Sequence, residues 1–255
     1  MHRFFVPVLQ IHDSQAVISG DEFHHLRHVL RLQIGAEITL CDDQGMEYRG
    51  TIAALAPASA EVVIRHTQHS TVPRLPLTLA LGLLKGQKMD LVIEKVTELS
   101  VNEILPFTST FTVSQLPAER QSERLSRWQR IAQSAAKQSG SPMPKIHTPQ
   151  LFEDLCGSQP SDTTTILFYE HERQATLKAF ATDHPQTASL RIVVGPEGGF
   201  APAEIGLARQ AGIHVLGLGP QILRAETASI VAVALCRFLW DDAAVPPLPQ
   251  RAHKT

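Results

Sequence analysis

Cysteine is scarce in this chain of 255 residues, which has only Cys41, Cys156 and Cys236. They lie far apart and never in a C-x-x-C spacing, so neither a disulfide framework nor a cysteine-based zinc site is indicated. A strong net charge is also absent, because the formal value is -2 at neutral pH. Binding to nucleic acid would therefore need cations gathered locally on one face.

Long apolar runs are missing as well. No stretch approaches the roughly 20 residues of a membrane span, and the proline-interrupted start of the chain is too short for a signal peptide. We therefore expect a cytoplasmic protein without membrane contact. Hydrophobic residues nevertheless make up 43% of the chain, which is enough for a core that needs neither disulfides nor metal.

The N-terminal part of the chain has the pattern of a small β-rich domain. Alternating apolar residues predict strands around 38–40, 46–48 and 62–64. Ser19 and the glutamate three residues later have the form of a capping box, which predicts a helix that ends near Leu32. One helix among short strands is therefore expected here.

The pattern changes after a polar, proline-containing stretch at residues 67–76, which predicts a linker. Beyond it, apolar runs separated by longer helical patterns favour a parallel sheet covered by helices. Amphipathic spacing predicts helices within 89–99 and 125–135 and a last helix over 226–240. The predicted strands are 77–84, 103–107, 164–169, 190–194 and 213–218.

These patterns define the domain organisation that we expect. An N-terminal domain covers residues 1–71, and a C-terminal α/β domain covers residues 72–242. The proline-rich residues 243–255 are predicted to form a flexible tail.

Two glycine-bearing loops follow neighbouring predicted strands, at Gly195–Gly199 and Leu218–Ala228. Ligands of a parallel sheet lie at the carboxyl ends of its strands, and glycine lets the backbone approach them closely. Either loop alone could be an ordinary tight turn. Neither matches the G-x-G-x-x-G or the P-loop pattern, so neither a Rossmann dehydrogenase nor a P-loop nucleotidase is supported.

The predicted N-terminal helix carries a possible phosphate-binding stripe. At 100° per residue, three apolar residues share one face and four basic or titratable residues share the other: Phe23, Leu26 and Leu30 against His24, Arg27, His28 and Arg31. Phosphate is the natural partner of such a stripe, although an ordinary solvated face is equally compatible. We expect no metal site from His24, His25 and His28, because no further ligand with a supporting shell is evident.

Taken together, the motifs resemble those of a known family. Gly195-Pro196-Glu197-Gly198-Gly199 followed by Leu223-Arg224-Ala225-Glu226-Thr227-Ala228 is similar to the small-subunit rRNA uridine-N3 methyltransferases, the RsmE family of the SPOUT or α/β-knot superfamily. The resemblance covers nearly the whole chain. Further matching segments lie at residues 1–6, 25–31, 85–90, 95–99 and 138–140.

The chain departs from the family pattern at three positions. Ser100 stands where the family usually has glycine, Lys137 where it usually has an acidic residue, and Ser141 where it usually has arginine. These departures fall on positions expected to face the substrate, whereas the cofactor motifs are unchanged.

The resemblance implies an α/β fold with an N-terminal PUA-like β-barrel and a C-terminal SPOUT domain that contains a deep trefoil knot. It implies a homodimer that uses S-adenosyl-L-methionine to methylate N3 of a specific uridine in 16S ribosomal RNA, within the assembled small subunit. The expected cofactor-binding residues are Phe168, Tyr169, Glu170, Val194, Gly195, Pro196, Glu197, Gly198, Gly199, Leu218, Gly219, Ile222, Leu223, Arg224, Thr227 and Ala228.

The resemblance also implies substrate contacts and catalytic candidates. Arg224 is a candidate for stabilising charge on the uracil oxygens, and Glu226 is a candidate either to orient Arg224 or to accept a proton. The expected RNA-binding residues are Arg3, His24, His25, Arg27, His28, Arg31, Lys85, Lys88 and Gln138. The alternatives are a related SPOUT enzyme acting on tRNA or on a ribose 2'-hydroxyl, and an RNA-binding assembly factor without turnover.

Overall fold

The computed structural model describes residues 2–12, 14–42, 46–69, 75–112 and 118–241. The chain forms two compact units, each made of several segments. The first combines Met1–Val72 with Asp90–Ile104 and Leu116–His147, and the second combines Pro73–Met89, Leu105–Gln115 and Thr148–Thr255. The predicted tail at 243–255 lies outside the described residues.

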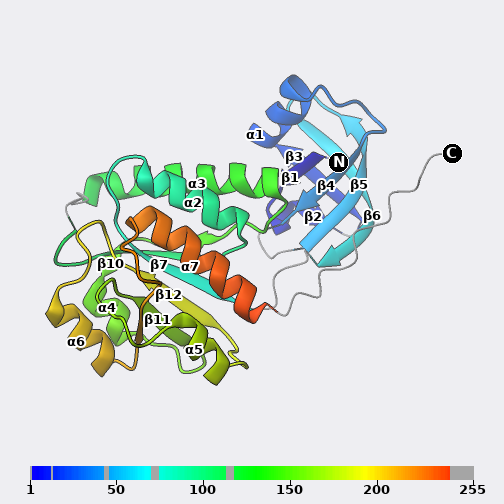
Figure 1. Ribbon diagram of the computed structural model, residues 1–255. Coiled ribbons are helices and arrows are strands. Elements are labelled where there is room, and N and C mark those ends of the chain that lie inside the picture. Colours follow the sequence, from blue (N-terminus) through cyan, green and yellow to red (C-terminus); the bar gives the residue numbers. More distant parts are fainter. Residues whose placement is uncertain (1, 13, 43–45, 70–74, 113–117, 242–255) are drawn as a thin grey trace. The chain divides into compact units, whose positions relative to one another are not determined.

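The N-terminal residues of the first unit form a six-stranded sheet with the order β1-β4-β5-β6-β3-β2 (Figure 1). β1 runs parallel to β4, and the other neighbours are antiparallel. The strands are β1 (His2–Phe5), β2 (Ile11–His12), β3 (Gln15–Ser19), β4 (Glu37–Cys41), β5 (Met46–Leu55) and β6 (Ser59–His69), with a 3-10 turn at Val8–Gln10. Phe4, Ile18, Leu40 and Val62 are fully buried in its core. The strands predicted around 38–40, 46–48 and 62–64 are confirmed, but in β5 the buried residue is Glu47, and its neighbours Met46 and Tyr48 are half-buried.

The predicted linker begins too early. β6 continues to His69, and its residues Thr67 and Gln68 pair with Tyr48 and Glu47 of β5. The polar side chains there are compatible with a strand because the backbone pairing satisfies their N–H and C=O groups. Residues 70–74 of the predicted linker lie outside the described residues.

Seven α-helices lie in the part of the chain that the structure describes, and none of them is long and apolar enough to cross a membrane. The amphipathic patterns at 89–99 and 125–135 are confirmed as helices, as is the last helix. The helices are α1 (Gly20–His24), α2 (Lys88–Glu98), α3 (Ala118–Ser139), α4 (Phe152–Gly157), α5 (Leu177–Asp183), α6 (Pro202–Gln210) and α7 (Ala225–Trp240), with a π-helical turn η2 at His25–Val29.

The N-terminal helix begins where predicted, but the capping box is wrong. Ser19 makes no side-chain cap, and the carboxylate of Glu22 accepts hydrogen bonds from Gln133, at 3.2 Å, and from Lys137. Because α3 engages this carboxylate, it does not return to the backbone of Ser19. The helical segment also ends earlier than the predicted Leu32, because its last turn is η2, which ends at Val29.

The predicted parallel sheet is present as a second sheet. Its strand order is β10-β8-β7-β12-β11-β13, and β9 pairs with β8 (Figure 1). All five predicted strands are confirmed, whereas β9 and β10, with two residues each, were not predicted. The strands are β7 (Leu77–Gly82), β8 (Glu103–Thr108), β9 (Lys145–Ile146), β10 (Gln150–Leu151), β11 (Thr164–Phe168), β12 (Leu190–Val194) and β13 (His214–Leu216).

Helices cover this sheet, and its central strands β7, β12 and β11 are almost entirely buried. Ala80, Leu167 and Val193 of three strands pack with Phe152 of α4 and Ile205 of α6. The last helix, α7, packs against β7 and β12. Every residue of β12 is buried, as expected for a parallel strand covered on both faces.

The three positions that depart from the family pattern have partners within the first unit. Ser100 has φ of +59°, in the left-handed region that favours glycine. Its Oγ donates a hydrogen bond to Ser141 Oγ at 3.1 Å, and Ser141 Oγ donates to the carbonyl of Glu98 at 3.1 Å. Lys137 pairs with Glu22. Two of the three departures are therefore in direct contact.

The three cysteines are free and buried. Desolvation is the main cause that raises the pKa of the Cys41 and Cys156 thiols to about 11 and that of Cys236 to about 12. All three are therefore neutral thiols at neutral pH.

Candidate active site

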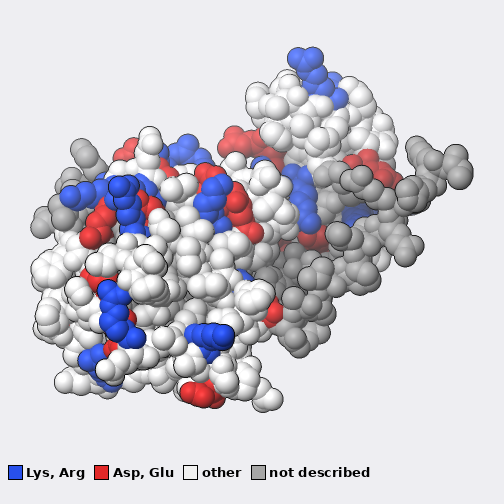
Figure 2. All heavy atoms as spheres, in the orientation of Figure 1, with Lys and Arg blue, Asp and Glu red and all other residues white. Residues whose placement is uncertain are grey.

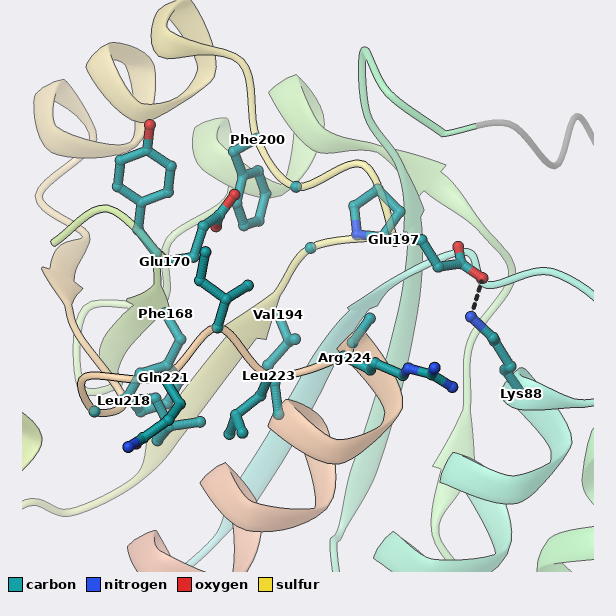
Figure 3. A pocket seen from close by; sticks show the side chains of 18 residues that line it. Lys88, Phe168, Glu170, Val194, Glu197, Phe200, Leu218, Gln221, Leu223 and Arg224 are labelled. Atoms are coloured by element: carbon teal, nitrogen blue, oxygen red, sulfur yellow. Dashed lines mark ion pairs between the residues drawn. The ribbon is translucent and has the colours of Figure 1, made fainter.

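A cavity of about 230 Å³ opens at the carboxyl ends of β11, β12 and β13 (Figure 3). This is the edge at which a parallel sheet places its ligands. Its lining residues are Lys88, Phe168, Tyr169, Glu170, Val194, Gly195, Pro196, Glu197, Gly199, Phe200, Leu218, Gly219, Gln221, Ile222, Leu223, Arg224, Ala225 and Ala228.

The first wall of the cavity is the loop after β12. The N–H of Gly199 donates to the carbonyl of Pro196 at 2.9 Å and closes a tight turn, and Gly199 has φ of +70°. Gly82, at the end of β7, supports this loop from behind. A Cβ atom on Gly82 would lie 2.5 Å from Cδ of Pro196 and 2.8 Å from the carbonyl carbon of Gly195. The loop is therefore held by backbone contact that only glycine permits.

The second wall is the loop between β13 and α7. The N–H of Gly217 donates to the carbonyl of Ala175 at 2.8 Å. Arg173 donates to the carbonyl oxygens of Pro220, at 2.6 Å, and of Gly219, at 3.4 Å. The segment after β11 thus fixes the second loop. Sequence reasoning missed this support, because an isolated arginine carries no recognisable pattern.

Charged side chains gather at one side of the cavity. Lys88 Nζ lies 3.2 Å from Glu197 Oε1 and 3.6 Å from Glu226 Oε2, and the N–H of Lys85 donates to Glu197 Oε1 at 3.1 Å. Burial disfavours the charged form of Glu197, but these backbone hydrogen bonds and the Lys88 ammonium outweigh it and lower the pKa of Glu197. Arg224 is the N-cap residue of α7, and its side chain extends toward this side of the cavity (Figure 3).

Most of the residues predicted to bind the cofactor line this one cavity. Gly198 and Thr227 do not, and Gly198 packs instead against Phe111, whose Cβ would lie 2.7 Å from an added Cβ. Glu226 also lies outside the lining, and its ion-pair partner is Lys88. The lining residues that were not predicted to bind the cofactor are Phe200, Gln221, Ala225 and Lys88. Phe200 directly follows the glycine motif, whereas Gln221 carries no local signal.

The residues predicted to bind RNA are placed differently from one another. His24, Arg27, His28 and Arg31 are exposed, as are Lys85 and Gln138. His25 is half-buried, with its ring 6.2 Å from that of Phe4. Arg3 donates to Glu47 at 2.7 Å and to the carbonyl of Gly140 at 2.6 Å, and Lys88 lies in the cavity. On the face seen in Figure 2, basic and acidic side chains are intermixed.

Comparison with known proteins places this site in a class. The family profile described as an RNA methyltransferase domain matches residues 71–237, and the RNA methyltransferase PUA domain matches residues 18–65. The parallel sheet with its glycine-lined cavity is thus that of an RNA methyltransferase that also carries a PUA domain.

Individual relatives show which family of RNA methyltransferases this chain resembles. The ribosomal RNA small subunit methyltransferase E of Bacillus subtilis is 32% identical over 93% of this chain and 96% of its own length. A crystal structure of a ribosomal RNA small subunit methyltransferase E from Neisseria gonorrhoeae, bound to S-adenosyl methionine, has a TM-score of 0.84 and 30% identity over 94% of this chain and 98% of its own. A methyltransferase of Legionella pneumophila in complex with bound cofactor SAM has a TM-score of 0.80 and 26% identity, covering 92% and 96% of the two chains. The chain belongs to the ribosomal RNA small subunit methyltransferase E family.

Proposed function

We propose that this protein transfers a methyl group from S-adenosyl-L-methionine to N3 of a specific uridine in 16S ribosomal RNA. The observation that carries the proposal is the cavity between the two glycine-bearing loops, in a chain that is 30% identical to a methyltransferase E crystallised with S-adenosyl methionine. Because ribosomal RNA is the substrate, the cytoplasm is the proposed location.

The lining of the cavity fits this cofactor. Gly195 and Gly199 line the first wall without a side chain, and Leu218, Ile222 and Leu223 supply apolar surface from the second. Pockets that are mostly apolar, with a few well-placed polar groups, are typical of cofactor sites. S-Adenosylmethionine, when bound, supplies an electrophilic methyl group on a sulfonium centre. Gly198 and Thr227, which do not line the cavity, are proposed to support the loop and the helix that do.

Besides binding the cofactor, the protein must hold the uridine and stabilise the negative charge that develops on its uracil ring. When N3 loses its proton to solvent water, negative charge spreads onto O2 and O4 of the uracil. Arg224 is exposed at the cavity, and its guanidinium makes no hydrogen bond or ion pair among the contacts of the described residues. It is therefore available to bind one of these oxygens, and a preorganised cation there lowers the barrier.

Two finer features of the fold are part of the proposal. We infer that the N-terminal sheet closes as a PUA-like barrel and that the loop after β13 passes through a trefoil knot, with the domains dividing as residues 1–71 and 72–242. The knot is supported by the backbone contact of Gly217 with Ala175 and by the return of α7 onto β7 and β12. These two contacts are compatible with a C-terminal segment that passes through the loop formed by the segment after β11.

The proposed RNA surface gives a prediction about salt dependence. Arg27 and Arg31 are exposed, so Arg27→Glu with Arg31→Glu should weaken RNA binding and lower the salt slope by about one unit per lost phosphate contact. Filter binding at several salt concentrations measures this, while cofactor affinity should not change. The control, Arg130→Glu with Lys178→Glu, alters two other exposed residues and makes the same change in charge. Equal effects of the two pairs would mean that net charge, and not the stripe, determines binding.

The proposed homodimer uses α7. This helix exposes 81% of Phe238 and 37% each of Leu235 and Leu239, and a second copy would cover them. We predict that Phe238→Asp weakens the dimer by more than about tenfold, because each buried phenylalanine side chain contributes about 1.5–3 kcal/mol. Sedimentation over a concentration series measures the equilibrium. Val29→Asp, at another exposed apolar side chain, is the control, and a wild-type monomer at micromolar concentration would contradict the dimer.

The function itself is tested by mapping modified bases in ribosomal RNA from cells that lack the protein. Loss of one N3-methyluridine from 16S RNA, restored when purified protein and S-adenosylmethionine are added to small subunits, is expected. Loss of a tRNA base or of a ribose 2'-O-methyl group would identify the related SPOUT activities. Unchanged RNA of every kind would leave an assembly factor without turnover.

A further inference from the structure

Lys88 and Glu226 occupy places that the sequence does not predict. Lys88 was expected to contact RNA, but it lines the cavity whose walls are the two glycine-bearing loops. Glu226 was expected at the reaction centre, but it lies outside the lining, and its Oε2 is buried without a hydrogen bond. The partner of that oxygen is the ammonium of Lys88, 3.6 Å away.

The two carboxylates that flank Lys88 come from two different elements of the fold. Glu197, in the loop after β12, lies 3.2 Å from Lys88 Nζ, and Glu226 stands in the first turn of α7. The side chains of Glu197 and Glu226 are 25% and 13% exposed, whereas that of Lys88 is 38% exposed. Lys88 and Glu197 both line the cavity and face one another there (Figure 3), whereas Glu226 lies outside the lining.

A flexible lysine gains a fixed position from such an arrangement. Its ammonium is a compact charge on a stem with four rotatable carbons, and it has three donors. Glu197, at 3.2 Å, can accept one of these donors, and Glu226, at 3.6 Å, adds its charge, which leaves a donor available to a ligand. Glu226 is placed to act through Lys88 and not as a base, because it lies outside the lining of the cavity and its buried Oε2 faces the ammonium.

We propose that Lys88 is a second catalytic cation, which binds one uracil oxygen while Arg224 binds the other, and that Glu226 is a positioning residue acting through Lys88. This inference rests on the proposed function. Uracil has two oxygens flanking N3, and two cations reach the cavity from the starts of α2 and α7. Deprotonation of N3 to solvent spreads charge onto both oxygens, so each cation stabilises the anion more than the neutral base.

The test combines single and double variants in single-turnover methylation of small subunits at saturating cofactor and RNA. Lys88→Met should slow methyl transfer about 100-fold, as expected for loss of one preorganised donor, and Glu226→Gln should slow it about tenfold. The double variant should be no slower than Lys88→Met alone, because Glu226 acts only through the lysine. Lys88→Arg, which keeps the charge, should recover part of the rate.

Lys95→Met is a closely matched control. Lys95 belongs to the same helix, its side chain is also 38% exposed, and it too contacts two carboxylates, Glu94 and Glu98. It lies outside the cavity, so its replacement should leave the rate within about twofold of wild type.

A second measurement needs no cofactor. Small-subunit RNA transcribed with 5-fluorouridine, which is more acidic at N3, should bind the Lys95→Met protein more tightly relative to ordinary RNA as pH rises. The Lys88→Met protein should lose much of this preference, since its anion-binding cation is gone. Calorimetry of cofactor binding and melting curves should show that both variants are folded and bind S-adenosylmethionine with wild-type affinity.

The outcomes separate this inference from the proposed function. Wild-type methylation together with an undiminished rate for Lys88→Met would overturn the inference alone. Independent, multiplying losses from Lys88→Met and Glu226→Gln would also overturn it, because Glu226 would then act by itself. A wild-type protein that binds the cofactor but methylates no ribosomal RNA would overturn the proposed function and the inference with it.

Discussion

Replacement of Arg224 with alanine should lower the rate of methyl transfer by about 10²–10³ while cofactor affinity changes little. Arg224 is the N-cap residue of α7, and it is an exposed residue that lines the cavity. Its backbone helps to form the wall that is expected to hold the cofactor, and alanine preserves that backbone. The guanidinium, in contrast, is free to bind a uracil oxygen, and its interaction strengthens as negative charge develops. The loss is therefore expected in the transition state and not in the ground state.

Single-turnover methylation at saturating cofactor and RNA measures this loss, and calorimetry measures cofactor affinity. Arg130→Ala is the control, because Arg130 is an exposed arginine of α3 outside the cavity. If Arg224 served only to begin its helix, the variant would melt at a lower temperature with a nearly normal rate. A well-folded Arg224→Ala protein with normal turnover would rule out the catalytic role.

The second large effect is expected at Gly82, which contacts Gly195 and Pro196 of the loop after β12 and does not line the cavity. A single added methyl group would lie 2.5 Å from Cδ of Pro196 and 2.8 Å from the carbonyl carbon of Gly195. These are parts of the loop backbone or of a rigid ring, so they cannot rotate away. Overpacking of this kind costs about 1–3 kcal/mol. If the loop moves to relieve it, Gly82→Ala should weaken cofactor binding by about tenfold to 100-fold.

Gly206→Ala is the matched control for this prediction. Gly206 lies in α6, and a Cβ atom there would meet no heavy atom within 4 Å. Alanine at that position should leave cofactor binding unchanged and slightly stabilise the helix. Calorimetry and urea unfolding of both variants distinguish loop displacement from general destabilisation. Normal affinity and stability of Gly82→Ala would show that the loop adapts without cost.

The sheet strands could be predicted because their signal is local. β12 is an apolar run interrupted only by Arg191, and its five residues are all buried. The glycine motif at the end of that strand could likewise be placed at the carboxyl edge, where parallel sheets bind ligands. Periodicity and turn chemistry are properties of neighbouring residues, so a single sequence is sufficient to detect them.

Contacts between distant segments could not be predicted in this way. The S-x-x-E pattern at Ser19 is formally a capping box, but Glu22 is engaged by Lys137 of α3. Similarly, nothing near Lys88 in the sequence indicates that Glu226 of α7 is its partner. Both contacts escaped prediction for the same reason: the sequence pattern identifies a carboxylate but not the cation that folding brings to it.

The burial of all three cysteines also determines how the protein can be labelled. Thiolates react with maleimides, and thiols whose pKa values are about 11 to 12 are almost entirely protonated at neutral pH. The native protein should therefore be nearly inert to a fluorescent maleimide. A single cysteine introduced at an exposed position such as Lys178 would then carry one dye at a known place, without removal of the natural cysteines. Singly labelled protein of this kind is suited to fluorescence measurement of binding to ribosomal subunits.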